Sequence, residues 1–204
     1  MQYIIVIYNI YVIIYIIDNG GNIMKKLITL CAILFTVVFI VWGIIRIVAY
    51  YQFSVGCGQY LQRAATANSI SLASSNLDTA ISYLENRNLT SGQVSIFLHQ
   101  PKNDITYWYS NLKSAQSELK NMSPDATQLE VSNELMKIKE TLVSNTSDGE
   151  VLIYPEGIEI YPHNVILFWI SLVSGVFGLV FWLRLTRTRL RERLAERRMH
   201  WSHK

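Results

Sequence analysis

The longest uncharged stretch near the C-terminal end of the chain covers residues 165–183 (VILFWISLVSGVFGLVFWL), which are 19 consecutive positions without a charged side chain. A helix of that length is roughly 28 Å long, close to the hydrocarbon thickness of a bilayer. We therefore predict a transmembrane helix over residues 164–183.

A second apolar stretch of the same length covers residues 27–45 (LITLCAILFTVVFIVWGII) and follows Lys25 and Lys26. Its core is longer than the roughly 7–15 residues typical of a cleaved signal peptide, and no small-x-small cleavage site follows it. The pattern predicts a retained transmembrane signal-anchor over residues 24–49.

Residues 1–23 are also mostly apolar, but their apolar run is short and ends at Asp18. The Gly20-Gly21 pair can be encoded by a ribosome-binding sequence at a workable distance from Met24. We therefore expect a bacterial protein whose translation starts at Met24, with residues 1–23 as an N-terminal extension. A short additional span is the alternative.

Residues 50–163 between the two spans show mainly helical periodicity, which predicts a domain of about three helices. Asp104 is suited to be the N-cap of the second helix, and Ser123 with Pro124 is suited to begin the third. Apolar stripes of this width are expected to bury one another as an antiparallel bundle. The stripes comprise Ile70, Ala73, Leu77, Ala80 and Leu84 in a segment that ends at Asn88, then Ile105, Trp108, Leu112, Ala115, Leu119 and Met122, and finally Val131, Leu135, Ile138 and Leu142.

Two further segments of this domain have the alternation of extended chain. One lies between Gly92 and Pro101. The other predicts a small β-hairpin in which residues 151–154 and 158–161 pair across a turn at residues 155–157. The predicted fold class is thus a mainly α membrane protein, with two transmembrane helices flanking an extracytoplasmic helical bundle with a small hairpin.

The distribution of charge predicts how the two spans are oriented in the membrane. Residues 50–163 contain twelve acidic and seven basic residues, a net charge of −5, whereas residues 184–204 contain eight basic and two acidic residues, a net charge of +6. Short basic flanks stay on the cytoplasmic side. We expect a multi-pass protein of the cytoplasmic (inner) membrane, with the C-terminus cytoplasmic and the central domain on the outer face.

The basic tail, residues 184–204, has one apolar face formed by Leu183, Leu190, Leu194 and Trp201. This pattern predicts an amphipathic helix on the inner membrane surface, where anionic lipids attract basic side chains. The expected membrane-surface residues are Arg184, Arg187, Arg189, Arg191, Arg193, Arg197 and Arg198.

Small residues share one face of the second span, namely Ser171, Ser174, Gly175 and Gly178. Such a face lets another helix approach closely. The first span offers a matching strip in Ala32, Thr36 and Gly43. An intramolecular pair of spans and a homo-oligomer are both open.

No arrangement of reactive residues emerges from the sequence. His99 and His163 lie in loop-like contexts without a nucleophile in a fitting pattern, and Cys31 and Cys57 do not suggest a disulfide or a metal pair. We expect no catalytic, cofactor-binding or metal-binding residue, no cofactor and no enzymatic activity.

In the order of its elements the chain is similar to the sensor halves of bacterial receptors, although no motif carries the similarity. In this sequence no signalling module follows Arg198. We therefore expect a membrane-anchored interaction or scaffold protein with a protein partner or a second copy as its partner. The alternative is an extracytoplasmic ligand-sensing module that signals through a separate cytoplasmic partner. Nucleic-acid binding by the tail is a weaker option and is not expected.

Overall fold

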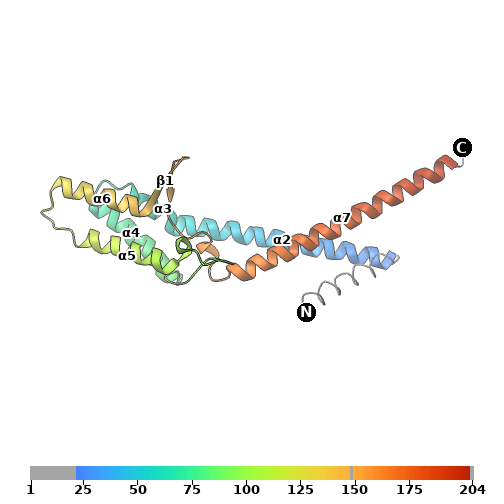
Figure 1. Ribbon diagram of the computed structural model, residues 1–204, viewed down its shortest axis with the longest axis horizontal. Helices are drawn as coiled ribbons and strands as arrows, with labels where there is room; N and C mark the ends of the chain where they lie inside the picture. Colours follow the sequence, from blue (N-terminus) through green and yellow to red (C-terminus); the bar gives the residue numbers. More distant parts are fainter. Residues whose placement is uncertain (1–21, 148, 203–204) are drawn as a thin grey trace. The chain divides into compact units, whose positions relative to one another are not determined.

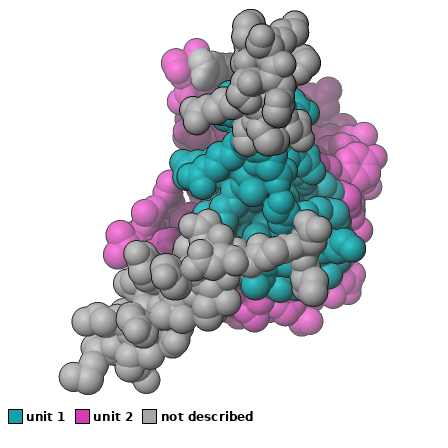
Figure 2. Space-filling view, turned by 90° about the vertical axis from the view of Figure 1, so that its right-hand side faces the viewer, with its two compact units in different colours: residues 1–43, 169–204 teal, residues 44–168 magenta. Residues whose placement is uncertain are grey.

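The computed structural model describes residues 22–147 and 149–202, and the expected extension over residues 1–23 lies outside them except for its last two residues. The chain divides into two units, one of residues 1–43 with 169–204 and the other of residues 44–168 (Figure 2). The described part is mostly helical (Figure 1). Its elements are α2 (Asn22–Phe53), η1 (Ser54–Gly58), α3 (Gln59–Ala65), α4 (Ile70–Asn86), η2 (Pro101–Asn103), α5 (Ile105–Lys120), α6 (Gln128–Leu142), β1 (Val143–Thr146), β2 (Gly149–Leu152), η3 (Ile158–Ile160) and α7 (Asn164–Ser202).

Two helices of the described chain are long and apolar enough to cross a membrane, by length and composition. One begins at Met24 and the other at Asn164, as the two apolar stretches of the sequence predict. Most of their large side chains are exposed in the protein alone; Leu30 and Leu179, for example, are 65% and 62% exposed. Apolar side chains around a helix that does not bury them in its own chain are typical of a lipid-facing surface.

The unit of residues 44–168 includes a helix that the hydrophobic pattern did not predict, α3. The helix α2 continues through η1, a short π-helical turn, into α3. Phe53, Cys57 and Leu61 of this segment are buried in the core of the unit. Four helical segments therefore enclose this core, because α3 packs against α4 and α6, and α5 packs against α4 and α6.

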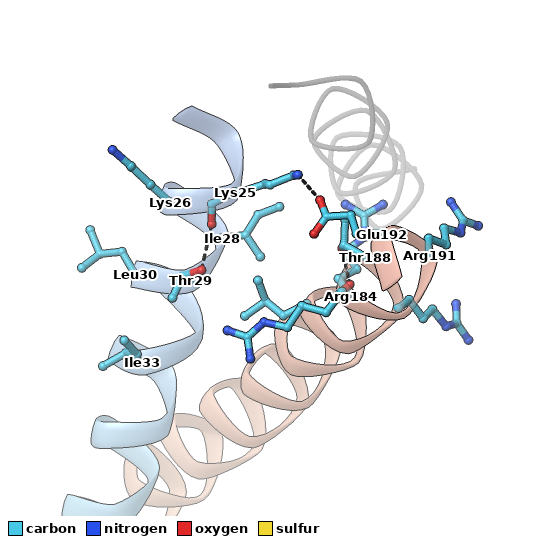
Figure 3. Close-up of a pocket in the computed structure, with 13 residues that line it drawn as sticks. Lys25, Lys26, Ile28, Thr29, Leu30, Ile33, Arg184, Thr188, Arg191 and Glu192 are labelled. Carbon is cyan, nitrogen blue, oxygen red and sulfur yellow. Dashed lines mark hydrogen bonds and ion pairs between the residues drawn. The ribbon is translucent and has the colours of Figure 1, made fainter. Parts of the chain in front are cut away.

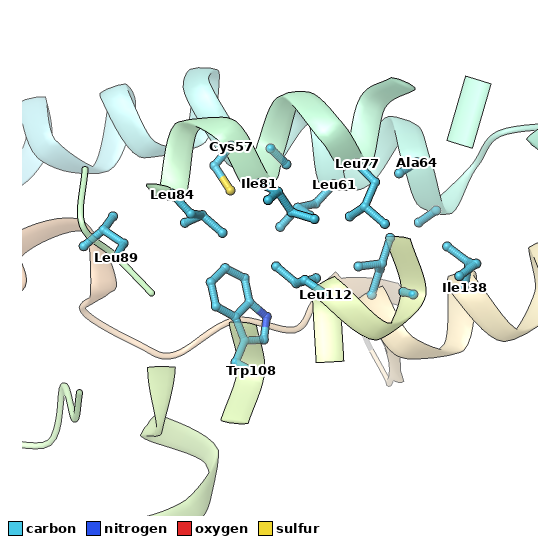
Figure 4. Close-up of a cluster of buried hydrophobic side chains, with 14 of the residues drawn as sticks. Cys57, Leu61, Ala64, Leu77, Ile81, Leu84, Leu89, Trp108, Leu112 and Ile138 are labelled. Carbon is cyan, nitrogen blue, oxygen red and sulfur yellow. The ribbon is translucent and has the colours of Figure 1, made fainter. Parts of the chain in front are cut away.

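The predicted stripes of α4 and α5 form most of that core (Figure 4). Leu77 and Leu84 of α4 and Ile105 and Leu112 of α5 are each at most 1% exposed. The prediction that Asp104 caps α5 is confirmed, since its carboxylate accepts hydrogen bonds from the backbone N–H groups of the first turn. Such a cap satisfies donors that have no partner within the helix.

The predicted start of the third helix is wrong. Helix α6 begins at Gln128, with Thr127 rather than Ser123 as its N-cap. Thr127 and Glu130 form a capping box, in which the Thr127 hydroxyl accepts from the Glu130 N–H and the Glu130 carboxylate accepts from the Thr127 N–H. This reciprocal pair satisfies two backbone donors, whereas Pro124 is compatible with a helix start but supplies no hydrogen bond to it. The helix ends at Leu142, where the predicted stripe ends.

The position of the predicted hairpin is also wrong, although a two-stranded antiparallel hairpin is present. It pairs β1 with β2, in the register Val143 with Leu152, and Gly149 at its turn has a φ of 122°. Residues 158–160, predicted to be a strand, form the 3-10 helix η3 after Gly157, whose φ is 93°. The segment from Gly92 to Pro101 forms only an isolated bridge between Gln93 and Asp104.

Candidate functional site

The polar side chains of the unit of residues 44–168 form small surface clusters that join neighbouring helices. The Tyr109 hydroxyl donates a 2.6 Å hydrogen bond to the Glu85 carboxylate, and Lys113 lies 3.6 Å from the same carboxylate. Asp78 accepts hydrogen bonds from Gln116 and Lys120 in a similar way. These clusters pair opposite charges on exposed helix faces, which is an arrangement that supports helix packing and contains no activated nucleophile.

The pKa values in the first cluster follow from its geometry. Burial and the hydrogen bond to Glu85 raise the pKa of Tyr109 to about 12. The same hydrogen bond, together with Lys113, lowers the pKa of Glu85. Both shifts keep the pair in its hydrogen-bonded state of a neutral phenol and a carboxylate at neutral pH.

The described part of the chain contains no cluster of metal-ligating side chains. No three His, Cys, Asp or Glu side chains gather there in a way that could hold a metal ion. His99 and His163 are both exposed, and Cys31 and Cys57 are free thiols. Trp108 is 7% exposed and belongs to the core.

A cleft lies within the other unit, between the first turns of α2 and the basic part of α7 (Figure 3). Its volume is about 680 Å³, within the range of roughly 300–1,000 Å³ that is usual for ligand sites. Six cations, one carboxylate and several apolar side chains line it: Lys25, Lys26, Ile28, Thr29, Leu30, Ile33, Arg184, Leu185, Arg187, Thr188, Arg189, Arg191 and Glu192.

An ion pair and an apolar contact join the two helices at the cleft. Lys25 of α2 pairs with Glu192 of α7, and Figure 3 shows both side chains reaching across the gap between the helices. Ile28 and Leu185 are buried in one apolar cluster with Ala32, and they are 9% and 7% exposed. Arg184 extends from α7 toward α2, and Lys26 lies on the far side of α2.

The predicted small face of α7 lies against α2 within this unit. An added Cβ at Gly178 would lie 3.7 Å from Cβ of Phe35, and one at Gly175 would lie 3.2 Å from the ring of Phe39. Ser174 is 2% exposed, and its hydroxyl donates to the carbonyl of Ile170. Ser171, the fourth member of the face, is half-buried.

The matching strip on α2 is used in part. Ala32 is fully buried, and Thr36 accepts a 3.0 Å hydrogen bond from the indole N–H of Trp182. Stacked rings of Phe35 with Phe177 and Phe181 lie beside this contact. Gly43 takes no part, since an added Cβ there would meet nothing within 4 Å.

The predicted membrane-surface arginines fall into two groups, one that lines the cleft and one that lies outside it. Arg184, Arg187, Arg189 and Arg191 line the cleft, whereas Arg193 and Arg197 are exposed and lie outside its lining. The side chain of Arg198 lies outside the described residues, as does that of Trp201. The predicted tail helix is present as the direct continuation of α7, with Leu183, Leu190 and Leu194 exposed.

Lys25, Lys26 and Glu192 line the cleft but were not predicted from the sequence to be site residues. A pair of antiparallel spans brings the start of the first next to the end of the second, so the two basic flanks could have been expected to meet. Comparison with protein-family models, with curated proteins and with solved structures found no match for this chain.

Proposed function

We propose that this protein is a non-enzymatic, membrane-anchored interaction or scaffold protein of the bacterial cytoplasmic membrane. In this proposal α2 and α7 each cross the bilayer, residues 50–163 form an extracytoplasmic helical bundle, and the basic tail lies at the cytoplasmic leaflet. The observation that carries the proposal is the pair of apolar helices, whose large side chains are mostly exposed apart from the face where they contact each other.

Charge supports the proposed direction of insertion. The cations at the start of α2 and those after Leu183 flank the same end of the helix pair, as expected for cytoplasmic flanks. Arg46 at the other end of the first span is the exception to this rule. It lies 3.5 Å from the carboxylate of Glu159, whose side chain is only 7% exposed, so its positive charge is compensated within its own unit.

The core of residues 44–168 supports an interaction role over catalysis. It is filled by aliphatic and aromatic side chains of the unit itself. On the surface of the unit, the charged side chains of each cluster pair with one another. A rigid helical unit held at a membrane surface presents outward faces to a partner protein or a second copy.

Reporter fusions test the topology. Alkaline phosphatase inserted at Gly149, an exposed hairpin turn whose surroundings are open, should be active, and phosphatase fused after Lys204 should be inactive. A green fluorescent protein fused after Lys204 should fluoresce. The opposite pattern at both positions would contradict the proposed sidedness.

Affinity purification from detergent-solubilised membranes tests the interaction. A membrane or extracytoplasmic protein in a fixed ratio to this chain, or a stable homo-oligomer, supports the scaffold. Its absence after chemical cross-linking in intact cells would contradict the proposal.

A second candidate is a sensing module with a separate cytoplasmic partner. The observation in its favour is the uninterrupted helix from Met24 to Ala65, which joins an apolar span to the buried core residues Cys57 and Leu61. A π-helical turn within such a helix is frequent at functional sites. Copurification of a cytoplasmic kinase or regulator would favour this candidate over the scaffold.

A further inference from the structure

We propose that the basic cleft between α2 and α7 is a binding site for the headgroup of an anionic phospholipid of the cytoplasmic leaflet. This inference rests on the proposed membrane insertion and adds a discrete ligand site to it. The charged side chains that line the cleft are six cations and a single carboxylate.

The charges fit a phosphate group. Lysine and arginine side chains from both helices line the same space, so a phosphate in the cleft could be contacted from two sides. Arginine supplies paired N–H donors that match phosphate oxygens, and charge-assisted hydrogen bonds of this kind are among the strongest in proteins. Basic pockets between transmembrane helices on the cytoplasmic side are a recurrent means of binding anionic headgroups.

The apolar part of the lining favours a lipid over a soluble anion. Ile28 and Leu185 close the cleft between the helices, while Leu30 and Ile33 line it and are 65% and 49% exposed. The exposed apolar surface continues along α2 at Leu34 and Val37. A phospholipid can place its phosphate among the cations and its acyl chains along this surface, whereas inorganic phosphate gains nothing from the apolar side chains.

Glu192 acts as an internal competitor for the site. Its carboxylate pairs with Lys25 at the edge of the cleft. A lipid phosphate approaching Lys25 must replace or share that contact and is repelled by the carboxylate. Removing the negative charge of Glu192 should therefore strengthen lipid binding, which is a change in the direction opposite to that of a damaging mutation.

Binding is measured on the full chain purified in a neutral detergent, by native mass spectrometry with short-chain phosphatidylglycerol, with phosphatidylcholine as the zwitterionic comparison. We expect phosphatidylglycerol to bind at least about tenfold more tightly, on the basis of roughly fivefold per engaged cation. The double variant Arg184→Gln/Arg187→Gln, which removes two cations of α7 that line the cleft, should lose most of this preference.

The matched control is Arg193→Gln/Arg197→Gln, which removes the same two charges from exposed positions outside the cleft. It should change binding by no more than about twofold. Glu192→Gln should bind phosphatidylglycerol about threefold to fivefold more tightly. Helical content by circular dichroism confirms that each variant is folded, and the effect of Glu192→Gln cannot be produced by unfolding.

Three outcomes would overturn the proposal. Equal losses in the two double variants would mean that only the general charge of the tail attracts lipid. Weaker binding by Glu192→Gln would mean that its ion pair builds the cleft instead of competing for it. Displacement of the lipid by millimolar inorganic phosphate would assign the cleft to a soluble anion. The reporter fusions are independent of all three, so failure of the membrane topology is distinguishable from failure of the lipid site.

Discussion

The indole N–H of Trp108 donates a 2.8 Å hydrogen bond to the backbone carbonyl of Ile153. This bond ties the core face of α5 to the segment that follows β2, and Trp108 is 7% exposed. Trp108→Phe keeps an aromatic ring but leaves the Ile153 carbonyl without this donor, which we expect to cost about 1–3 kcal/mol. Thermal unfolding in detergent, followed by circular dichroism, measures the loss. Tyr107→Phe on the same helix, where the side chain is 66% exposed, should unfold like the unmodified protein.

Stability should depend on pH through Tyr109 and Glu85. The Tyr109 hydroxyl lowers the pKa of Glu85 below its usual 4.5, so the contribution of this carboxylate is complete above pH 4.5 and is lost as pH falls through its folded-state pKa. Burial and the bond to Glu85 raise the pKa of Tyr109 from 10 to about 12, so its contribution is complete below pH 10 and is lost as pH rises toward 12.

The variant Tyr109→Phe tests this coupling. It should lower the unfolding temperature at pH 7, and the difference from the unmodified protein should shrink as pH falls below 4.5 and through the lowered pKa of Glu85. Unfolding temperatures between pH 3 and pH 7 provide the measurement. A difference that stays constant across this range would show that the hydrogen bond to Glu85 contributes no pH dependence.

Two glycines with similar backbones make a matched pair. Gly92 and Gly149 have φ values of 115° and 122°, which L-residues rarely adopt. An added Cβ at Gly149 would meet nothing within 4 Å, whereas one at Gly92 would lie 2.0 Å from the hydroxyl oxygen of Tyr161. Gly149→Ala should therefore cost only backbone strain, about 1–3 kcal/mol. Gly92→Ala should cost about 1–3 kcal/mol more, because the Tyr161 ring must move. Equal unfolding temperatures for the two variants would contradict the close approach at Gly92.

The sequence predicted a helix correctly where the spacing of its apolar residues and its N-cap residue indicated the same start. Asp104 precedes a stripe with steps of three and four residues, and α5 follows that pattern from Ile105 to Lys120. At the third helix two start signals competed. The Thr127-x-x-Glu130 pattern was present in the sequence, and its two reciprocal hydrogen bonds decide the start over the single permissive proline.

The hairpin shows why short apolar runs mislead. Apolar and polar residues alternate over residues 158–160 as they do in a strand. Gly157, however, has a positive φ, and η3 begins directly after it. Glycine is a common residue at turns, and Gly149 at the start of β2 is the sequence signal that could have indicated the actual hairpin. The cleft could not be predicted residue by residue, because its lining depends on which faces of α2 and α7 meet, and the sequence alone does not fix those faces.

Larger residues at Gly175 and Gly178 should weaken the contact between α7 and α2, and Gly43 provides a control position in the same protein. In Gly175→Ile the new Cβ would lie 3.2 Å from the Phe39 ring, so the ring must shift slightly. In Gly178→Ile the new Cβ would lie 3.7 Å from Cβ of Phe35 and 3.9 Å from Thr36, which leaves little room for the rest of the side chain. Each should destabilise the pair of spans by about 1–3 kcal/mol through overpacking. The comparable substitution Gly43→Ile lies in the other helix, with nothing within 4 Å of its Cβ. All three changes raise intrinsic helix propensity alike, so a difference between them reports helix contact.

The measurement is unfolding temperature in detergent, combined with the molecular mass of the protein–detergent complex. We expect Gly175→Ile and Gly178→Ile to unfold at lower temperature and Gly43→Ile to be unchanged, with the mass constant in all three, because the contact is made within one chain. A fall in mass with the first two substitutions would instead assign the small face to a homo-oligomer. No change in either quantity would leave the face without a role in helix packing, and would mean that its small residues reflect only their frequency in apolar spans.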